Sequence, residues 1–114
     1  MPQNDKTAAV LRFVGLAARA RRTVNGIELI STALSRGAKE KTPLVILEAS
    51  DSSANTHKRI NDRAAYYGVP SFRLSIDGGR LALAVGKRDG TVMAVGVTEP
   101  NLAREITAML NQNN

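Results

Sequence analysis

The chain has 114 residues, enough for one domain with a single hydrophobic core, and its 16 Lys and Arg residues against 10 Asp and Glu residues give a net charge of +6. It contains no Cys, which excludes disulfide bridges, thiolate zinc sites and cysteine nucleophiles. Two Phe, two Tyr and no Trp are too few aromatic residues for a platform on which successive bases stack. The excess of positive charge, carried mostly by Arg, points to an anionic partner such as nucleic acid.

The first predicted element is an amphipathic helix that starts near Thr7. From Val10 onward, apolar residues recur at i, i+3, i+4 and i+7, the stripe of a helix with one buried face. Thr7 or Asp5 can cap this helix, and we expect residues 1–6 to be frayed. The helix ends in a cluster of three arginines, a placement that the helix dipole favours: Arg19, Arg21 and Arg22.

The arginine cluster leads into the stretch on which the functional prediction depends. The β-formers Thr23-Val24 indicate a short strand, and Asn25-Gly26 indicates a tight turn. A second helix is predicted over residues 26–36, with Gly37 in the C′ position. This geometry would point free backbone N–H groups and a positive dipole end outward beside the arginines, which suits a phosphate.

The rest of the chain alternates strands and helices. Further strands are predicted at residues 44–49, 71–75 and 91–97. Further helices are predicted at residues 54–67, 80–86 and 100–110, the first of which should bury Ile60, Ala64 and Tyr67. The alternation predicts an α/β protein, a three-layer α/β/α sandwich around a mainly four-stranded mixed sheet. We expect one domain over residues 1–114, with frayed tails at 1–6 and 111–114.

Three sequence blocks, RARRTVNG, LVILEASDSSANTHKRINDRAAYYGVP and GKRDGTVMAVGVTE, resemble in order and spacing the family of ribosomal proteins seven-Ae and thirty-e. The resemblance covers nearly the whole chain and is strongest to the small stand-alone bacterial branch called YlxQ-like. It implies an α/β/α sandwich that binds RNA, typically at kink-turns, where a sharply bent internal loop carries sheared G·A pairs and a protruding base.

In that family, the first strand's end and the second helix's start insert at the kink, while an Asp-bearing loop and the loop before the last strand close around the protruding nucleotide. Together with the arginine cluster, the matching positions give the predicted RNA-binding residues: Arg19, Arg21, Arg22, Asn25, Gly26, Glu28, Asp51, Gly86, Lys87 and Arg88. The kink-turn readers carry Asn, Glu and Lys where this chain has Glu28, Leu29 and Thr32. Leu29 can neither donate nor accept a hydrogen bond, so general RNA binding is predicted and kink-turn specificity does not follow.

We therefore predict a non-enzymatic, cytoplasmic protein without cofactor or metal, whose partner is structured RNA, ribosomal or other, or the ribosome itself. No signal-peptide pattern and no apolar run near the ~20 residues of a membrane span is present.

The alternative is a protein–protein adaptor that reuses the fold, which would explain why the Asn, Glu and Lys of the kink-turn readers are missing. A weaker alternative is an enzyme at the 50–53 loop with His57 as base, but no nucleophile elbow precedes His57, which we expect on the surface of the third helix. The same helix should carry a solvated charged face: Lys58, Arg59 and Arg63.

Overall fold

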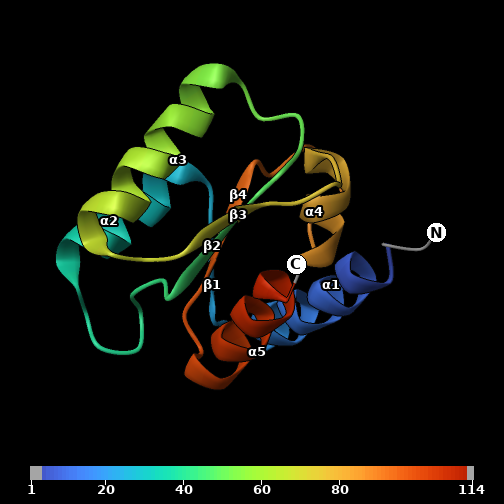
Figure 1. Cartoon of the computed structure of the whole chain (residues 1–114), viewed down its shortest axis with the longest axis horizontal. Helices are drawn as coiled ribbons and strands as arrows, with labels where there is room; N and C mark the ends of the chain where they lie inside the picture. The colour runs from blue at the N-terminus through green and yellow to red at the C-terminus, as the bar shows by residue number, and fades with distance from the viewer. Residues whose placement is uncertain (1–3, 113–114) are drawn as a thin grey trace.

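The computed structural model describes residues 4–112, and within this range it contains five helices and four strands (Figure 1). The helices are α1 (Asn4–Arg19), α2 (Ile27–Arg36), α3 (Ala54–Tyr67), α4 (Gly78–Ala84) and α5 (Pro100–Asn111). The strands are β1 (Thr23–Asn25), β2 (Val45–Glu48), β3 (Ser71–Arg73) and β4 (Ala94–Val97).

The four strands form one mixed sheet in the order β1-β4-β2-β3. β4 pairs antiparallel with both β1 and β2, and β2 pairs parallel with β3. Helices α2 and α3 cover one face of this sheet, and α1, α4 and α5 cover the other (Figure 1). The predicted three-layer sandwich with a four-stranded mixed sheet is confirmed. β1 is an edge strand, with β4 on one side and no strand on the other.

Alternate residues of the central strands enter two separate hydrophobic clusters. In β2, Val45 and Leu47 belong to the cluster under α1, α4 and α5, whereas Ile46 joins Ile30 and Ile60 under α2 and α3. Both faces of β2 are therefore covered, which explains why its sequence is an almost unbroken apolar run. The exception in this run is Glu48, whose carboxylate is also buried.

The helix ends follow from local capping. Gly37 ends α2 with a left-handed φ of 59°, as predicted for its C′ position. Ser53 caps α3 by accepting the Thr56 N–H at 3.1 Å, and Asp77 caps α4 by accepting the Arg80 N–H at 2.9 Å. Because Asp77 is the cap, α4 begins at Gly78 and not at residue 80 as predicted.

Several other predictions about ends and burial are wrong. β3 ends at Arg73 and not at residue 75, and Asn111 of the predicted 111–114 tail belongs to α5. Helix α1 begins at Asn4, so residues 4–6 are helical and neither Thr7 nor Asp5 is its N-cap. The Thr7 hydroxyl instead makes a tertiary contact, 3.4 Å from the hydroxyl of Ser75. Tyr67, the last residue of α3, is 37% exposed and not buried, because its side chain lines a surface hollow and does not join the hydrophobic cluster under α2 and α3. β4 begins at Ala94 and not at residue 91.

Residues 1–3 and 113–114 of the predicted tails lie outside the described range. No helix within residues 4–112 is long and apolar enough to cross a membrane.

Candidate nucleic-acid interface

An open groove of about 660 Å³ lies beside the edge strand β1, and we call it the β1 groove. Its walls come from β1, from the outward face of α2, from residues 38–41 and from the loop between α4 and β4. Apolar side chains from β1 and α2 line part of it, among them Val24, Leu29 and Ala33. The groove therefore brings together four segments that are far apart in the sequence.

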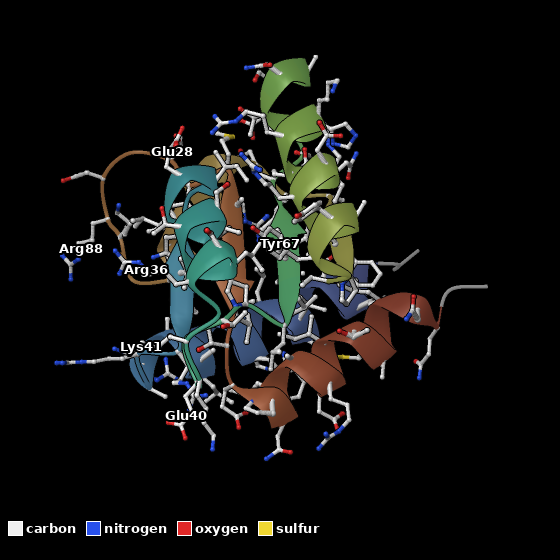
Figure 2. The ribbon with its side chains drawn as sticks, turned by 90° about the vertical axis from the view of Figure 1, so that its left-hand side faces the viewer. Glu28, Arg36, Glu40, Lys41, Tyr67 and Arg88 are labelled. Atoms are coloured by element: carbon white, nitrogen blue, oxygen red, sulfur yellow. The ribbon has the colours of Figure 1, made fainter. Side chains whose placement is uncertain are left out.

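The charges around the β1 groove are mostly positive. Four basic side chains line it, against the single carboxylate of Glu40: Arg21, Arg36, Lys41 and Lys87. Within residues 4–112, none of the four has a carboxylate partner. Figure 2 shows Arg36 and Lys41 extending toward the same side of the molecule as Arg88 from the α4–β4 loop. Unpaired guanidinium and ammonium groups in a groove attract a polyanion and can donate hydrogen bonds to its phosphates.

The three arginines of the predicted cluster do not share one surface. Arg21 is exposed, has a left-handed φ of 61° and lines the β1 groove. Arg22 is half-buried, and its Nε and Nη2 donate to Thr98 Oγ1 at 3.1 Å and to the Thr98 carbonyl at 2.9 Å. Arg19 is the exposed last residue of α1 and does not line the groove. Arg21 therefore faces the groove, whereas Arg22 holds the end of β1 against β4.

The predicted tight turn between β1 and α2 is confirmed. Gly26 has a φ of 96°, which only glycine adopts without strain, and its N–H donates to the Ala94 carbonyl at 2.8 Å. No side chain caps the start of α2, and a Cβ on Gly26 would meet no atom within 4 Å. The backbone at this corner is therefore open to close approach. Next to it, Asn25 Oδ1 is buried and has no hydrogen-bond partner.

Glu28 is tied to the neighbouring helix. Its carboxylate accepts from Arg59 Nη2 at 2.8 Å, which joins the first turn of α2 to α3. The prediction that Arg59 is merely solvated is therefore wrong, because its side chain is only 37% exposed and ion-paired. Glu28 itself remains 79% exposed, so the pair lies at the surface.

The remaining predicted residues come from two loops. Asp51 is exposed, and its Oδ1 accepts the Gly78 N–H at 2.9 Å, which fixes the β2–α3 loop to the start of α4. It does not line the β1 groove. Gly86 has a φ of 86° and directs the chain into the α4–β4 loop, where Lys87 lines the groove and Arg88 is exposed.

Two of the four basic groove residues were not predicted from the sequence. Arg36 is in register with Leu29, Thr32 and Ala33 at i, i+3, i+4 and i+7 on α2, so helical spacing contained the signal for one lining stripe. Lys41 carried no such signal, because its position depends on the irregular connection from α2 to β2.

The buried Glu48 carboxylate organises the other end of the sheet. His57 Nδ1 lies 2.8 Å from its oxygens, Ser52 Oγ donates to it, and Arg73 Nε lies 3.8 Å away. His57 is in α3 as predicted, but its side chain is half-buried by this contact. Ser52 and His57 both bind the same carboxylate and not each other, so the arrangement lacks a nucleophile–base pair. Within the described residues, no group of three or more His, Cys, Asp or Glu is placed to hold a metal ion.

Comparison with solved structures identifies the fold class. The chain superposes on the Giardia lamblia 15.5kD RNA binding protein with a TM-score of 0.78 over 97% of this chain and 92% of that one, at 14% identity. A protein of unknown function from Bacillus halodurans matches with a TM-score of 0.79 and 26% identity, over 90% of this chain and 97% of the other. The fold is thus that of the 15.5kD class, as the resemblance implied.

Sequence comparison identifies the family within that class. The chain is 33% identical over 99 residues to RNA-binding protein YlxQ of Bacillus subtilis (strain 168), which covers 87% of this chain and 92% of the relative. RNA-binding protein YlxQ of Enterococcus faecium is 39% identical over 64 residues, 56% of this chain and 58% of the relative. No protein-family model matches the chain. The chain belongs to the YlxQ family, which confirms the predicted branch. The names of these relatives describe RNA-binding proteins and not enzymes, in agreement with the prediction of a non-enzymatic protein.

Replacing Glu48 with Ala is expected to destabilise the protein by about 2 kcal/mol, because it leaves the buried Ser52 hydroxyl and the half-buried His57 ring without their shared acceptor. The free energy of unfolding from urea titration measures the effect. The matched control is Glu105→Ala on the exposed face of α5, which should change stability by less than about 0.5 kcal/mol. Equal effects of the two substitutions would contradict the organising role of Glu48.

Proposed function

We propose that this chain is a non-enzymatic RNA-binding protein that holds structured RNA in the β1 groove. The observation that carries the proposal is the groove itself, with four basic side chains that have no carboxylate partner within residues 4–112. The family relationship to proteins named for RNA binding supports it.

The backbone conformation of Arg21 belongs to the end of α1. The Arg21 N–H donates to the Ala18 carbonyl at 3.0 Å and the Arg22 N–H to the Ala17 carbonyl at 2.8 Å, the hydrogen bonds of a helix C-cap with a left-handed residue. A left-handed φ of 61° costs a residue with a Cβ about 1 kcal/mol, whereas Gly adopts it freely. The functional role proposed for Arg21 therefore rests on its exposed side chain, which lines the β1 groove and has no carboxylate partner within residues 4–112.

The arrangement of the cations favours folded RNA over an extended single strand. Arg21, Arg36, Lys41 and Lys87 come from four segments around one opening, so they can reach phosphates of more than one strand. The uncapped start of α2 beside Gly26 adds free N–H groups at one end of the groove. We accordingly propose that the partner is a bent or internally looped RNA, ribosomal or other, met in the cytoplasm.

Substituting Arg21 with Gly is expected to separate binding from stability. Loss of one phosphate contact should weaken binding of an internal-loop RNA hairpin roughly fivefold or more and reduce the slope of log K against log salt concentration by roughly one. The same substitution relieves the left-handed strain, so the free energy of unfolding should stay constant or rise by up to about 1 kcal/mol. Fluorescence anisotropy over a salt series and urea titration provide the two measurements.

The matched control for Arg21→Gly is Arg12→Ala on the exposed face of α1, in the opposite layer of the sandwich. This variant removes the same charge and should leave both affinity and salt slope within error of the parent protein. If Arg21→Gly and Arg12→Ala behave alike, net charge and not the groove determines RNA binding.

Kink-turn selectivity is a separate proposal. Leu29 and Thr32 line the groove where the resemblance places a Glu and a Lys, and Leu29 is 60% exposed. We expect the triple variant Glu28→Asn, Leu29→Glu, Thr32→Lys to gain roughly tenfold in its preference for a kink-turn over a fully paired duplex of equal length, because base-edge contacts are restored. Thr32→Lys alone should raise affinity for both RNAs equally. An unchanged preference in the triple variant would show that other residues determine selectivity.

The adaptor alternative is favoured by one observation, the exposed Leu29 in the middle of a basic groove. A protein partner would bury this side chain, whereas RNA would pass beside it. A complex with a defined protein that survives nuclease treatment and high salt, and that Leu29→Glu disrupts, would favour the adaptor over RNA binding.

A further inference from the structure

A second hollow, of about 300 Å³, lies between α2 and α3, and we call it the α2–α3 hollow. Its lining combines hydroxyl, basic and aromatic side chains: Ser31, Thr32, Ser35, Arg36, Arg63 and Tyr67. The two helices run in parallel here, because Arg59 near the start of α3 pairs with Glu28 at the start of α2, and Tyr67 at the end of α3 lies near Arg36 at the end of α2. In Figure 2, Tyr67 lies in the gap between the two helices.

The charge of this hollow is positive. None of its six lining residues is acidic, and Glu28 in the first turn of α2 is ion-paired with Arg59 at 2.8 Å. Arg63 and Arg36 have no carboxylate partner within residues 4–112. Ser31 Oγ is buried and has no hydrogen-bond partner among residues 4–112, and rotation about χ1 can turn it toward a ligand. The hollow therefore offers donors for an anion and an unused hydroxyl.

Two aromatic side chains lie at the end of α3, where Tyr67 lines the hollow and Tyr66 stands beside it. The rings of Tyr66 and Tyr67 have centroids 4.8 Å apart and an interplanar angle of 79°. Tyr66 is 79% exposed and Tyr67 is 37% exposed, so neither ring is used in the hydrophobic core. They are half of the aromatic residues of the chain. Exposed rings next to cations are the side chains on which unpaired bases stack.

We propose that the α2–α3 hollow binds an unpaired, single-stranded segment of the same RNA. This inference rests on the proposed function, because it assigns a second contact surface to the RNA held in the β1 groove. Arg63 binds a phosphate of the segment, and the Tyr66–Tyr67 pair stacks on one or two bases. The low aromatic content argues against a long stacking platform but is sufficient for this short one.

The two hollows adjoin each other. Thr32 and Arg36 line both the β1 groove and the α2–α3 hollow, so α2 forms the wall between them. An RNA strand that leaves a folded region in the groove needs to cross only this one helix to reach Tyr67. Continuity with the groove and the unpaired cations on both sides favour nucleic acid over a protein partner as the occupant.

The test compares two forms of one RNA probe, a hairpin with an asymmetric internal loop and a blunt end, and the same hairpin with six unpaired uridines added to its 5′ or 3′ end. The parent protein should bind at least one of the two extended hairpins, with the 5′ or the 3′ uridines, roughly tenfold more tightly than the blunt hairpin. Tyr66→Ala and Arg63→Gln should each remove most of this gain and leave the affinity for the blunt hairpin unchanged. Tyr67→Phe, which retains a stacking ring, and Arg12→Ala, in the opposite layer, should keep the gain.

The outcomes distinguish failure of the α2–α3 site from failure of RNA binding in the β1 groove. If the parent protein binds the blunt hairpin and gains nothing from either extension, the hollow is not an RNA site and the proposed function stands. If the gain persists in Tyr66→Ala and Arg63→Gln, the segment lies elsewhere and the inference is wrong. If neither hairpin binds, the proposed function fails and the inference fails with it. A protein that self-associates through Tyr66, with dimer formation lost in Tyr66→Ala and no effect of the extension, would also overturn it.

Discussion

The short strand β1 is fixed to β4 at both of its ends, and the position of the β1 groove depends on this. At one end the Arg22 carbonyl accepts the Thr98 N–H at 2.9 Å, and the Arg22 side chain donates twice to Thr98. At the other end the Gly26 N–H donates to the Ala94 carbonyl at 2.8 Å. The chain enters and leaves this strand through positive φ angles at Arg21 and Gly26. The C-cap of α1 and the pairing of β1 therefore together place Arg21 at the groove, and α2 starts beside it.

The excess charge of the chain is not spread evenly over its surface. On α3 and near the end of β2, acidic and basic side chains satisfy one another, as in Lys58–Asp62, Arg59–Glu28 and the contacts of His57 and Arg73 with Glu48. Around the β1 groove, four cations face one carboxylate. The two surface pairs, Lys58–Asp62 and Arg59–Glu28, contribute little to stability, but they remove charge from the potential that a polyanion meets. Cations without a carboxylate partner within residues 4–112 also lie on other elements, such as Arg63 on α3, but around the β1 groove four of them line one opening.

The sequence predicted what depends on local signals. Gly37 ends α2, Pro100 begins α5, and the apolar run of β2 lies in the centre of the sheet, since spacing and capping residues act over a few positions. The direction of the arginines could not be predicted, because it depends on a left-handed φ at Arg21 and on a partner of Arg22 that is 76 residues away. The role of Glu48 was hidden for the same reason: in an apolar run, only the folded structure shows that a carboxylate meets His57 and Ser52.

The central claim is that RNA is held in the groove between β1, α2 and the α4–β4 loop. The most direct measurement is an NMR titration of the ¹⁵N-labelled protein with an internal-loop RNA hairpin, following each backbone amide. The account predicts the largest chemical-shift changes at Arg21, Asn25, Gly26, Arg36 and Lys87, with α1 and α5 nearly unchanged. Changes concentrated on α1 and α5, with the amides of the β1 groove unmoved, would contradict it.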